Sequence, residues 1–209
     1  MGKWHRLAVE VSLALMLAGW GCVASAADVV VGLVVAVRGE VLSDAGAGQQ
    51  ALAVNAPVHR GETIVTGAGK AKIALNDGSI ISIGENTRVR MVHFAGTSKS
   101  ANVALNLVSG VLRPFVVKGA STGTFEIETQ TAVAAVRGTD WVIEATPERT
   151  SVAVVRGVVA VSGRTDRQAT VVLRSPGQGT DVPRGSAPTP PAPWGIKRLA
   201  GILARATFD

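Results

Sequence analysis

Two glutamates on one expected strand are the residues best able to do acid–base chemistry. Glu126 and Glu128 alternate with Phe125 and Ile127, so on a strand they project from one face, roughly 7 Å apart. That separation lies within the range of the carboxylate pairs in inverting glycoside hydrolases. Those enzymes also need a shifted carboxyl pKa and an aromatic sugar cleft, whereas glutamates on a wet strand face are ordinary solvation. A carbohydrate-active enzyme is therefore the most remote alternative.

Nucleophilic, metal and phosphate chemistry have little support in the sequence. After residue 26 the chain has His59 and His93 but no cysteine, and it has no Gly-x-Ser-x-Gly or His-Glu-x-x-His motif. The two histidines stand on unrelated segments without the spacing of metal ligands. Gly67–Lys70 fails as a phosphate-binding loop, because Ile64 and Ala71 replace its first glycine and its Ser or Thr. We expect no catalytic residues, no metal, no cofactor and no enzymatic activity.

Three arginines recur at the same place in a repeated turn. Val37-Arg38-Gly39, Val136-Arg137-Gly138 and Val155-Arg156-Gly157 each follow a run of Val and Ala residues. Gly138 stands at a turn, where we expect a positive φ. In a stack of strand–turn–strand units these guanidinium groups could form a row. Such a row requires pairing with carboxylates such as Glu40 and Asp140, or a bound polyanion. Nucleic acid is not the expected anion, because the aromatic residues on which bases stack make up only 4% of the chain.

Short strands and glycine turns must position these residues. The chain has 209 residues, of which 47% are hydrophobic and 17% charged, so it can bury one aliphatic core and is too apolar for intrinsic disorder. No helical period occurs between residues 29 and 182, and Asp77-Gly78 between two apolar runs is a hairpin signal. We expect an all-β fold of short strands stacked in two sheets. The irregular repeat spacing leaves a β-solenoid-like and a β-sandwich form open.

The N-terminal end has the pattern of a secretory signal. Lys3 and Arg6 precede a short apolar run that leads to Ala24-Ser25-Ala26, which predicts a signal helix cleaved after residue 26. An uncleaved anchor is disfavoured because the run is shorter than the roughly 20 residues that span a bilayer. Lipidation of Cys22 is disfavoured by the Gly and Trp residues before it. We expect export to the periplasm or cell surface, with no transmembrane helix in the mature chain.

The C-terminal end departs from the β pattern. Residues 183–193 contain five of the nine prolines, which indicates an extended linker. In residues 194–209 the apolar side chains gather on one side of a helical wheel, with basic side chains elsewhere. This short amphipathic helix either folds back onto its own domain or docks on a membrane or a partner. The expected organisation is a signal peptide over 1–26, a β domain over 27–182, a linker over 183–193 and a helical tail over 194–209.

Five motifs follow one another in a fixed order through the β domain. They are Val37-Arg38-Gly39-Glu40-Val41, Gly61-Glu62-Thr63-Ile64-Val65-Thr66-Gly67, Leu75-Asn76-Asp77-Gly78-Ser79, Leu107-Val108-Ser109-Gly110-Val111-Leu112, and Ala132-Val133-Ala134-Ala135-Val136-Arg137-Gly138-Thr139-Asp140-Trp141. In this order they resemble the FecR-like domain family of bacterial extracytoplasmic proteins. Trp141 takes the place of the phenylalanine that closes the family's Val-Arg-Gly-Thr-x-Phe motif.

The resemblance implies an all-β extracytoplasmic domain without catalytic function that acts as a sensor or interaction module. In the best-known members this domain follows a cytoplasmic anti-sigma segment and a transmembrane helix, and it relays a signal from an outer-membrane siderophore transporter. Here we expect only a signal peptide before the domain, so direct control of a sigma factor is not expected. The motif residues with an expected structural or interaction role are Arg38, Gly39, Gly61, Asp77, Gly78, Arg137, Gly138, Thr139, Trp141, Arg156 and Gly157.

The sequence therefore favours a non-enzymatic sensor or interaction module of the bacterial cell envelope. Its expected partner is an envelope protein or an anionic envelope polymer. The alternative is an envelope structural protein docked to a membrane or a partner through its C-terminal helix.

Overall fold

The computed structural model describes residues 29–46, 48–95, 102–117 and 123–208. The signal helix expected over 1–26, with Cys22, lies outside these residues. The described elements are β1 (Val30–Arg38), β2 (Val41–Asp44), β3 (Gln49–Ala51), β4 (Pro57–His59), β5 (Thr63–Thr66), β6 (Lys70–Leu75), β7 (Ile80–Ile83), β8 (Arg88–Ala95), β9 (Asn102–Phe115), β10 (Phe125–Glu128), β11 (Ala132–Val136), β12 (Asp140–Ala145), β13 (Arg149–Arg156), β14 (Val159–Gly163), β15 (Thr170–Leu173), β16 (Gln178–Pro183), β17 (Ala192–Pro193) and α1 (Ile196–Ala206).

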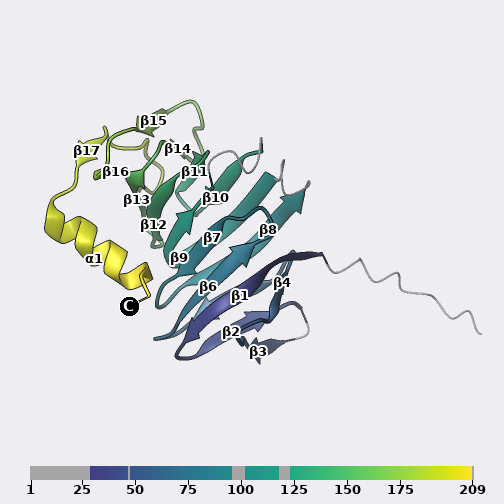
Figure 1. Ribbon diagram of the computed structural model, residues 1–209. Helices are drawn as coiled ribbons and strands as arrows, with labels where there is room; N and C mark the ends of the chain where they lie inside the picture. The colour runs from purple at the N-terminus through teal and green to yellow at the C-terminus, as the bar shows by residue number, and fades with distance from the viewer. Residues whose placement is uncertain (1–28, 47, 96–101, 118–122, 209) are drawn as a thin grey trace, which may run out of the picture.

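The strands form two facing sheets that share the long strand β9 (Figure 1). Sheet A has the order β4-β1-β6-β7-β9-β12-β13-β16-β17. Sheet B has the order β3-β2-β5-β8-β9-β10-β11-β14-β15. Of the described pairings, only that of β9 with β10 is parallel. The prediction of an all-β fold stacked in two sheets, with a short C-terminal helix, is confirmed.

The repeated glycines lie at corners where the chain passes from one sheet to the other. Gly39 follows β1, Gly138 joins β11 to β12, Gly157 joins β13 to β14, and Gly110 bends β9 itself; their φ angles are 67°, 68°, 106° and 97°. This left-handed region favours glycine over all other residues. Two of these corners also touch, since a Cβ on Gly157 would lie 2.9 Å from the carbonyl oxygen of Gly138. The repeat therefore marks the corners of the fold, and the positive φ expected at Gly138 is confirmed.

Aliphatic side chains from both sheets fill the space between them. Ile73 and Ile81 of sheet A pack in one cluster with Ile64 and Leu107 of sheet B, and all four are fully buried. Trp141 is the largest fully buried side chain in this layer. The core is thus aliphatic, as the low aromatic content predicts.

Helix α1 lies on the outer face of sheet A (Figure 1). Its Ile202 and Ala206 are buried against outward-facing residues of β9, β12 and β13, namely Val111, Val142 and Ala153. Of the two positions considered for the C-terminal tail, the structure shows it folded back onto its own domain. No helix in the described part of the chain is long and apolar enough to cross a membrane.

The proline-rich segment before α1 runs along β16. The Thr189 amide donates to the Asp181 carbonyl at 2.9 Å, and Thr180 Oγ1 donates to the Thr189 carbonyl at 2.7 Å. Further on, β17 pairs with the start of β16. The segment is extended, and these hydrogen bonds attach it to sheet A, which brings α1 to its place on the sheet.

Candidate interaction surface

The two glutamates singled out as a carboxylate pair are each bound by an arginine. On β10, Phe125 and Ile127 are buried while Glu126 and Glu128 face the outside of sheet B, as the alternation predicts. Glu126 lies 3.6 Å from Arg167, and Glu128 lies 3.2 Å from Arg164. The strand neighbours opposite Glu126 are alanines on β9 and β11, which give a sugar ring no aromatic surface. This arrangement is that of a solvated strand face.

The two histidines lie in different sheets. His59 ends β4 in sheet A, where its backbone amide donates to Glu62 Oε2 at 2.7 Å, and His93 is exposed on β8 in sheet B. Within the described residues, no group of His, Cys, Asp and Glu side chains is placed to hold a metal ion.

The structure separates the three arginines of the repeat. Arg38 is paired in register with Lys70 on β6, whereas Arg156 is paired with Asp140 on β12. Strands β1 and β13 are five places apart in sheet A, which is about 24 Å at the usual strand spacing. Arg137 stands beside Gly138, at the corner that touches the Arg156 corner. The expectation of one row of three guanidinium groups is therefore wrong: two lie together, and Arg38 lies at the far side of the sheet.

The other motif residues hold turns and corners together. The Thr139 hydroxyl donates to the Val158 carbonyl at 3.0 Å and so links the two touching corners. Buried Asp77 accepts hydrogen bonds from the Ser79 amide and hydroxyl, both at 2.9 Å, in the β6–β7 hairpin that contains Gly78. The Gly61 amide donates to the carbonyl of a β8 residue, Met91, at 2.6 Å. The side chains of Asp77 and Trp141 are buried, so neither of them is presented to a partner.

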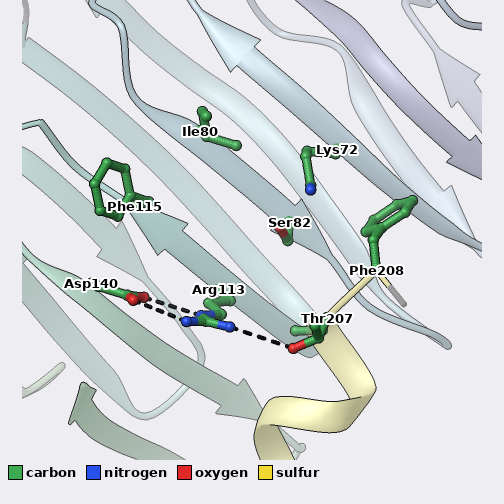
Figure 2. A pocket seen from close by; sticks show the side chains of 9 residues that line it. Lys72, Ile80, Ser82, Arg113, Phe115, Asp140, Thr207 and Phe208 are labelled. Atoms are coloured by element: carbon green, nitrogen blue, oxygen red, sulfur yellow. Dashed lines mark hydrogen bonds and ion pairs between the residues drawn. The ribbon is translucent and has the colours of Figure 1, made fainter. Parts of the chain in front are cut away.

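An exposed phenylalanine on the outer face of sheet A lies where aromatic, aliphatic and basic side chains border a hollow. Phe115, at the end of β9, is 48% exposed and lies between two hollows of about 230 and 220 Å³. Asp140 borders both hollows as well. The first is also lined by Lys72, Ile80, Ser82, Arg113, Thr207 and Phe208 (Figure 2). The second is also lined by Val116, Gly138, Thr139 and Arg156. We call these two hollows the Phe115 groove.

An ion pair forms the floor of the groove. Arg113 donates from Nε to Asp140 Oδ1 at 3.1 Å and from Nη2 to Oδ2 at 2.9 Å. These hydrogen bonds raise the pKa of Arg113 above its usual value, and burial opposes them only in part. Figure 2 shows Arg113 between Asp140 and Thr207, to whose hydroxyl its Nη1 donates at 3.4 Å. Asp140, the one carboxylate among the residues that line the groove, is therefore paired with Arg113, and the other two cations are Lys72 and Arg156.

The remaining cations face the groove without a carboxylate of their own. Lys72 Nζ lies 5.0 Å from the centre of the Phe208 ring, a cation–π contact. Arg156 is exposed at its corner. No described carboxylate lies within 4.0 Å of either side chain. The groove therefore combines an apolar surface with an excess of positive charge.

Sequence analysis identified only the corner side of this groove. Arg156 and Gly138 belong to the repeat and Thr139 to the Val-Arg-Gly-Thr-x-Phe motif, but Lys72 and Phe115 belong to no motif. The available signal was alternation: Lys72 faces outward on a strand whose intervening residues are buried. Their proximity depends on the pairing of β6, β7 and β9, which local patterns do not specify.

Comparison with known proteins agrees with this architecture. Residues 62–160 match the family model described as FecR protein, and no curated protein matches significantly. Two crystal structures of a Parabacteroides distasonis protein described as a candidate anti-sigma factor have a similar fold, with TM-scores of 0.52 and 0.53 at 19% and 18% identity. In each case 66% of this chain is covered, and the chain spans 62% of the neighbour. Through residues 62–160, which run from the residue before β5 into β14, the chain resembles the FecR family.

Proposed function

We propose that this chain is a non-enzymatic, extracytoplasmic sensor or interaction module of the bacterial cell envelope. The FecR match and the fold shared with a candidate anti-sigma factor support a regulatory role, and the signal pattern of residues 1–26 supports export. The observation that carries the proposal is the Phe115 groove. Most of the side chains that shape it, from Lys72 to Arg156, fall within the matched region, whereas Thr207 and Phe208 lie outside it. An exposed ring beside cations that lack a carboxylate partner is typical of a binding surface.

The chemistry of the groove favours binding over catalysis. Its carboxylate, Asp140, is held by two hydrogen bonds from Arg113, so it is not positioned as a base beside a nucleophile. Aromatic and arginine side chains at the centre of a hollow are instead typical of protein interfaces. An envelope protein is the partner that this composition favours. An anionic envelope polymer is the second candidate, supported by the exposed Arg137 and Arg156 at the touching corners.

A structural protein anchored through α1 has less support. The buried side of the helix, with Ile202 and Ala206, faces sheet A of its own domain. Ile196, at the start of the helix, is 90% exposed, but one aliphatic side chain offers little area for a membrane or a partner.

Photo-crosslinking in cells tests the proposed function. A photoreactive phenylalanine analogue at position 115 should give a discrete crosslinked species in the envelope fraction, and the same analogue at Arg88, exposed on sheet B, should not. Mass spectrometry of the recovered protein should find a mature N-terminus at Ala27. Crosslinking at both positions alike, or recovery of the chain with an intact Met1 from the cytoplasm, would contradict the proposal; a lipid on Cys22 would correct the mode of export.

A further inference from the structure

The outer face of sheet A carries an apolar stripe that leads into the Phe115 groove. Leu33 is opposite Ala74, Ala74 is opposite Ile80, and Ile80 is opposite Phe115. The two ends of the stripe, Leu33 and Phe115, are 49% and 48% exposed. Three strand spacings give it a length of about 14 Å, which matches about four residues of an extended chain.

Basic side chains flank this stripe. Lys72, Ser82 and Arg113 are paired in the adjacent cross-strand row, and Arg156 lies opposite Asp140 at the Phe115 end. Because Asp140 is bound by Arg113, the charge that complements this surface is negative. The complement of the stripe itself is an apolar side chain, which an anionic sugar polymer does not carry.

The end of α1 forms one wall of the groove. Thr207 and Phe208 line it, and they follow directly after the last helical residue. This wall is held in place by Lys70, whose Nζ donates to the carbonyls of Ala204 at 2.9 Å and Thr207 at 3.1 Å. A ligand that touches Phe208 and Lys72 therefore meets a complete site only when the helix is docked.

We propose that the Phe115 groove binds an extended peptide segment of a partner protein, in which carboxylates alternate with apolar side chains, and that this binding strengthens the docking of α1. The inference rests on the proposed interaction function and names the partner's chemistry. The stronger docking of α1 follows from thermodynamic linkage, because a ligand that binds the docked form more tightly than the undocked form stabilises the docked form. An isolated helix of eleven residues is marginal in water, so undocking of α1 also unfolds it.

Fluorescence polarisation with a defined probe tests the ligand chemistry. The probe is a fluorescein-labelled peptide of alternating aspartate and leucine, titrated with the full chain purified from the envelope fraction. We expect saturable binding with a Kd below about 1 mM, weakened about tenfold by Lys72→Met or Phe115→Ser. Arg88→Met, which removes an exposed charge from the far sheet, should leave the Kd unchanged. Peptides with asparagine for aspartate, or serine for leucine, should bind about tenfold more weakly.

Hydrogen exchange of the α1 amides tests the coupling. The probe peptide should slow their exchange in the wild-type chain, but not in Lys72→Met. Lys70→Met, which removes the helix-end contacts, should weaken peptide binding and speed α1 exchange while sheet exchange stays unchanged; Ile202→Ser is a second variant with the same expectation.

The outcomes separate this inference from the proposed function. If the probe does not bind while crosslinking at position 115 persists, the proposed acidic–apolar peptide ligand is wrong and the proposed interaction function still stands. Binding of polygalacturonate that Lys72→Met weakens, together with no binding of the peptide probe, assigns the groove to a polymer and likewise overturns the peptide ligand. Peptide binding without any change in α1 exchange overturns the coupling. Loss of both probe binding and position-specific crosslinking removes the proposed function as well.

Discussion

The outer face of sheet A has two halves that differ in how their side chains are used. Under α1, the outward residues Val111, Val142 and Ala153 are fully buried. Across the rest of the face, Leu33 and Phe115 remain about half exposed. The covered half is built of small aliphatic side chains that fit a helix, whereas the open half combines larger apolar side chains with cations.

The covered half also contains glycines that only close packing explains. A Cβ on Gly179 would lie 2.1 Å from the Trp194 ring, and a Cβ on Gly84 would lie 2.5 Å from the Arg205 carbonyl oxygen. The Trp194 ring in turn supports Arg198, whose guanidinium lies 3.6 Å from the ring centre. These positions are committed to the C-terminal segment, so we regard the covered half as part of the fold and the open half as the surface left for a partner.

The largest expected difference between the two halves comes from a matched pair of aspartate substitutions. Val142→Asp buries an unpaired charge under α1. It should lower the free energy of docking of α1 by about 3 kcal/mol, or abolish docking if that free energy is smaller. Leu33→Asp adds the same charge on the open half and should change the free energy of unfolding by less than about 1 kcal/mol. Chemical unfolding, with far-UV circular dichroism to follow the helix, measures both. Equal losses in the two variants would show that the halves do not differ.

A smaller effect is expected where the linker end meets the sheet. Gly179→Val forces Trp194 away from β16 and should destabilise docking by about 2 kcal/mol. The Trp194 ring should then be more exposed to water, so its fluorescence should shift to longer wavelength. Trp141 is fully buried and its emission should not change. The control is Gly201→Ala on the exposed side of α1, where a Cβ meets nothing within 4 Å; it should stabilise the helix by about 0.5–1 kcal/mol. An unshifted spectrum in Gly179→Val would place Trp194 elsewhere.

Local patterns predicted the parts of this molecule that depend on neighbouring residues. The alternation of β10 and the positive φ of Gly138 are properties of a few consecutive residues. The prediction of a row of three arginines was wrong because the Val-Arg-Gly motif specifies a corner of the chain but not the position of that corner in the sheet. Corners at opposite sides of sheet A have the same Val-Arg-Gly sequence.

The covering helix left a signal in the sequence that alternation alone does not explain. Residues Trp141–Ile143 of β12 are three consecutive apolar side chains, and the structure buries all of them. By contrast, β6 and β7 bury every second residue. A strand that is apolar on both faces must be covered on both. The open groove left no comparable signal, because its side chains come from β6, β7, β9 and the C-terminal end, which only long-range pairing brings together.

The smallest expected effect is a dependence of α1 docking on pH, confined to the covered half. Burial of Asp181 favours its neutral form, but hydrogen bonds from Arg198 and Ser151, both 2.6 Å long, outweigh it and hold the pKa of Asp181 below its usual value. A carboxyl whose pKa is lower in the folded state stabilises that state above the unfolded pKa, about 3.9, and this contribution is lost as the pH falls through the folded pKa. The carboxyl is partly exposed, so Asp181→Asn should cost less than about 1 kcal/mol at neutral pH and should flatten the acid limb of the docking curve followed by Trp194 fluorescence. Phe115→Ser on the open half should leave that limb unchanged, and an acid limb that survives in Asp181→Asn would assign it to another carboxyl.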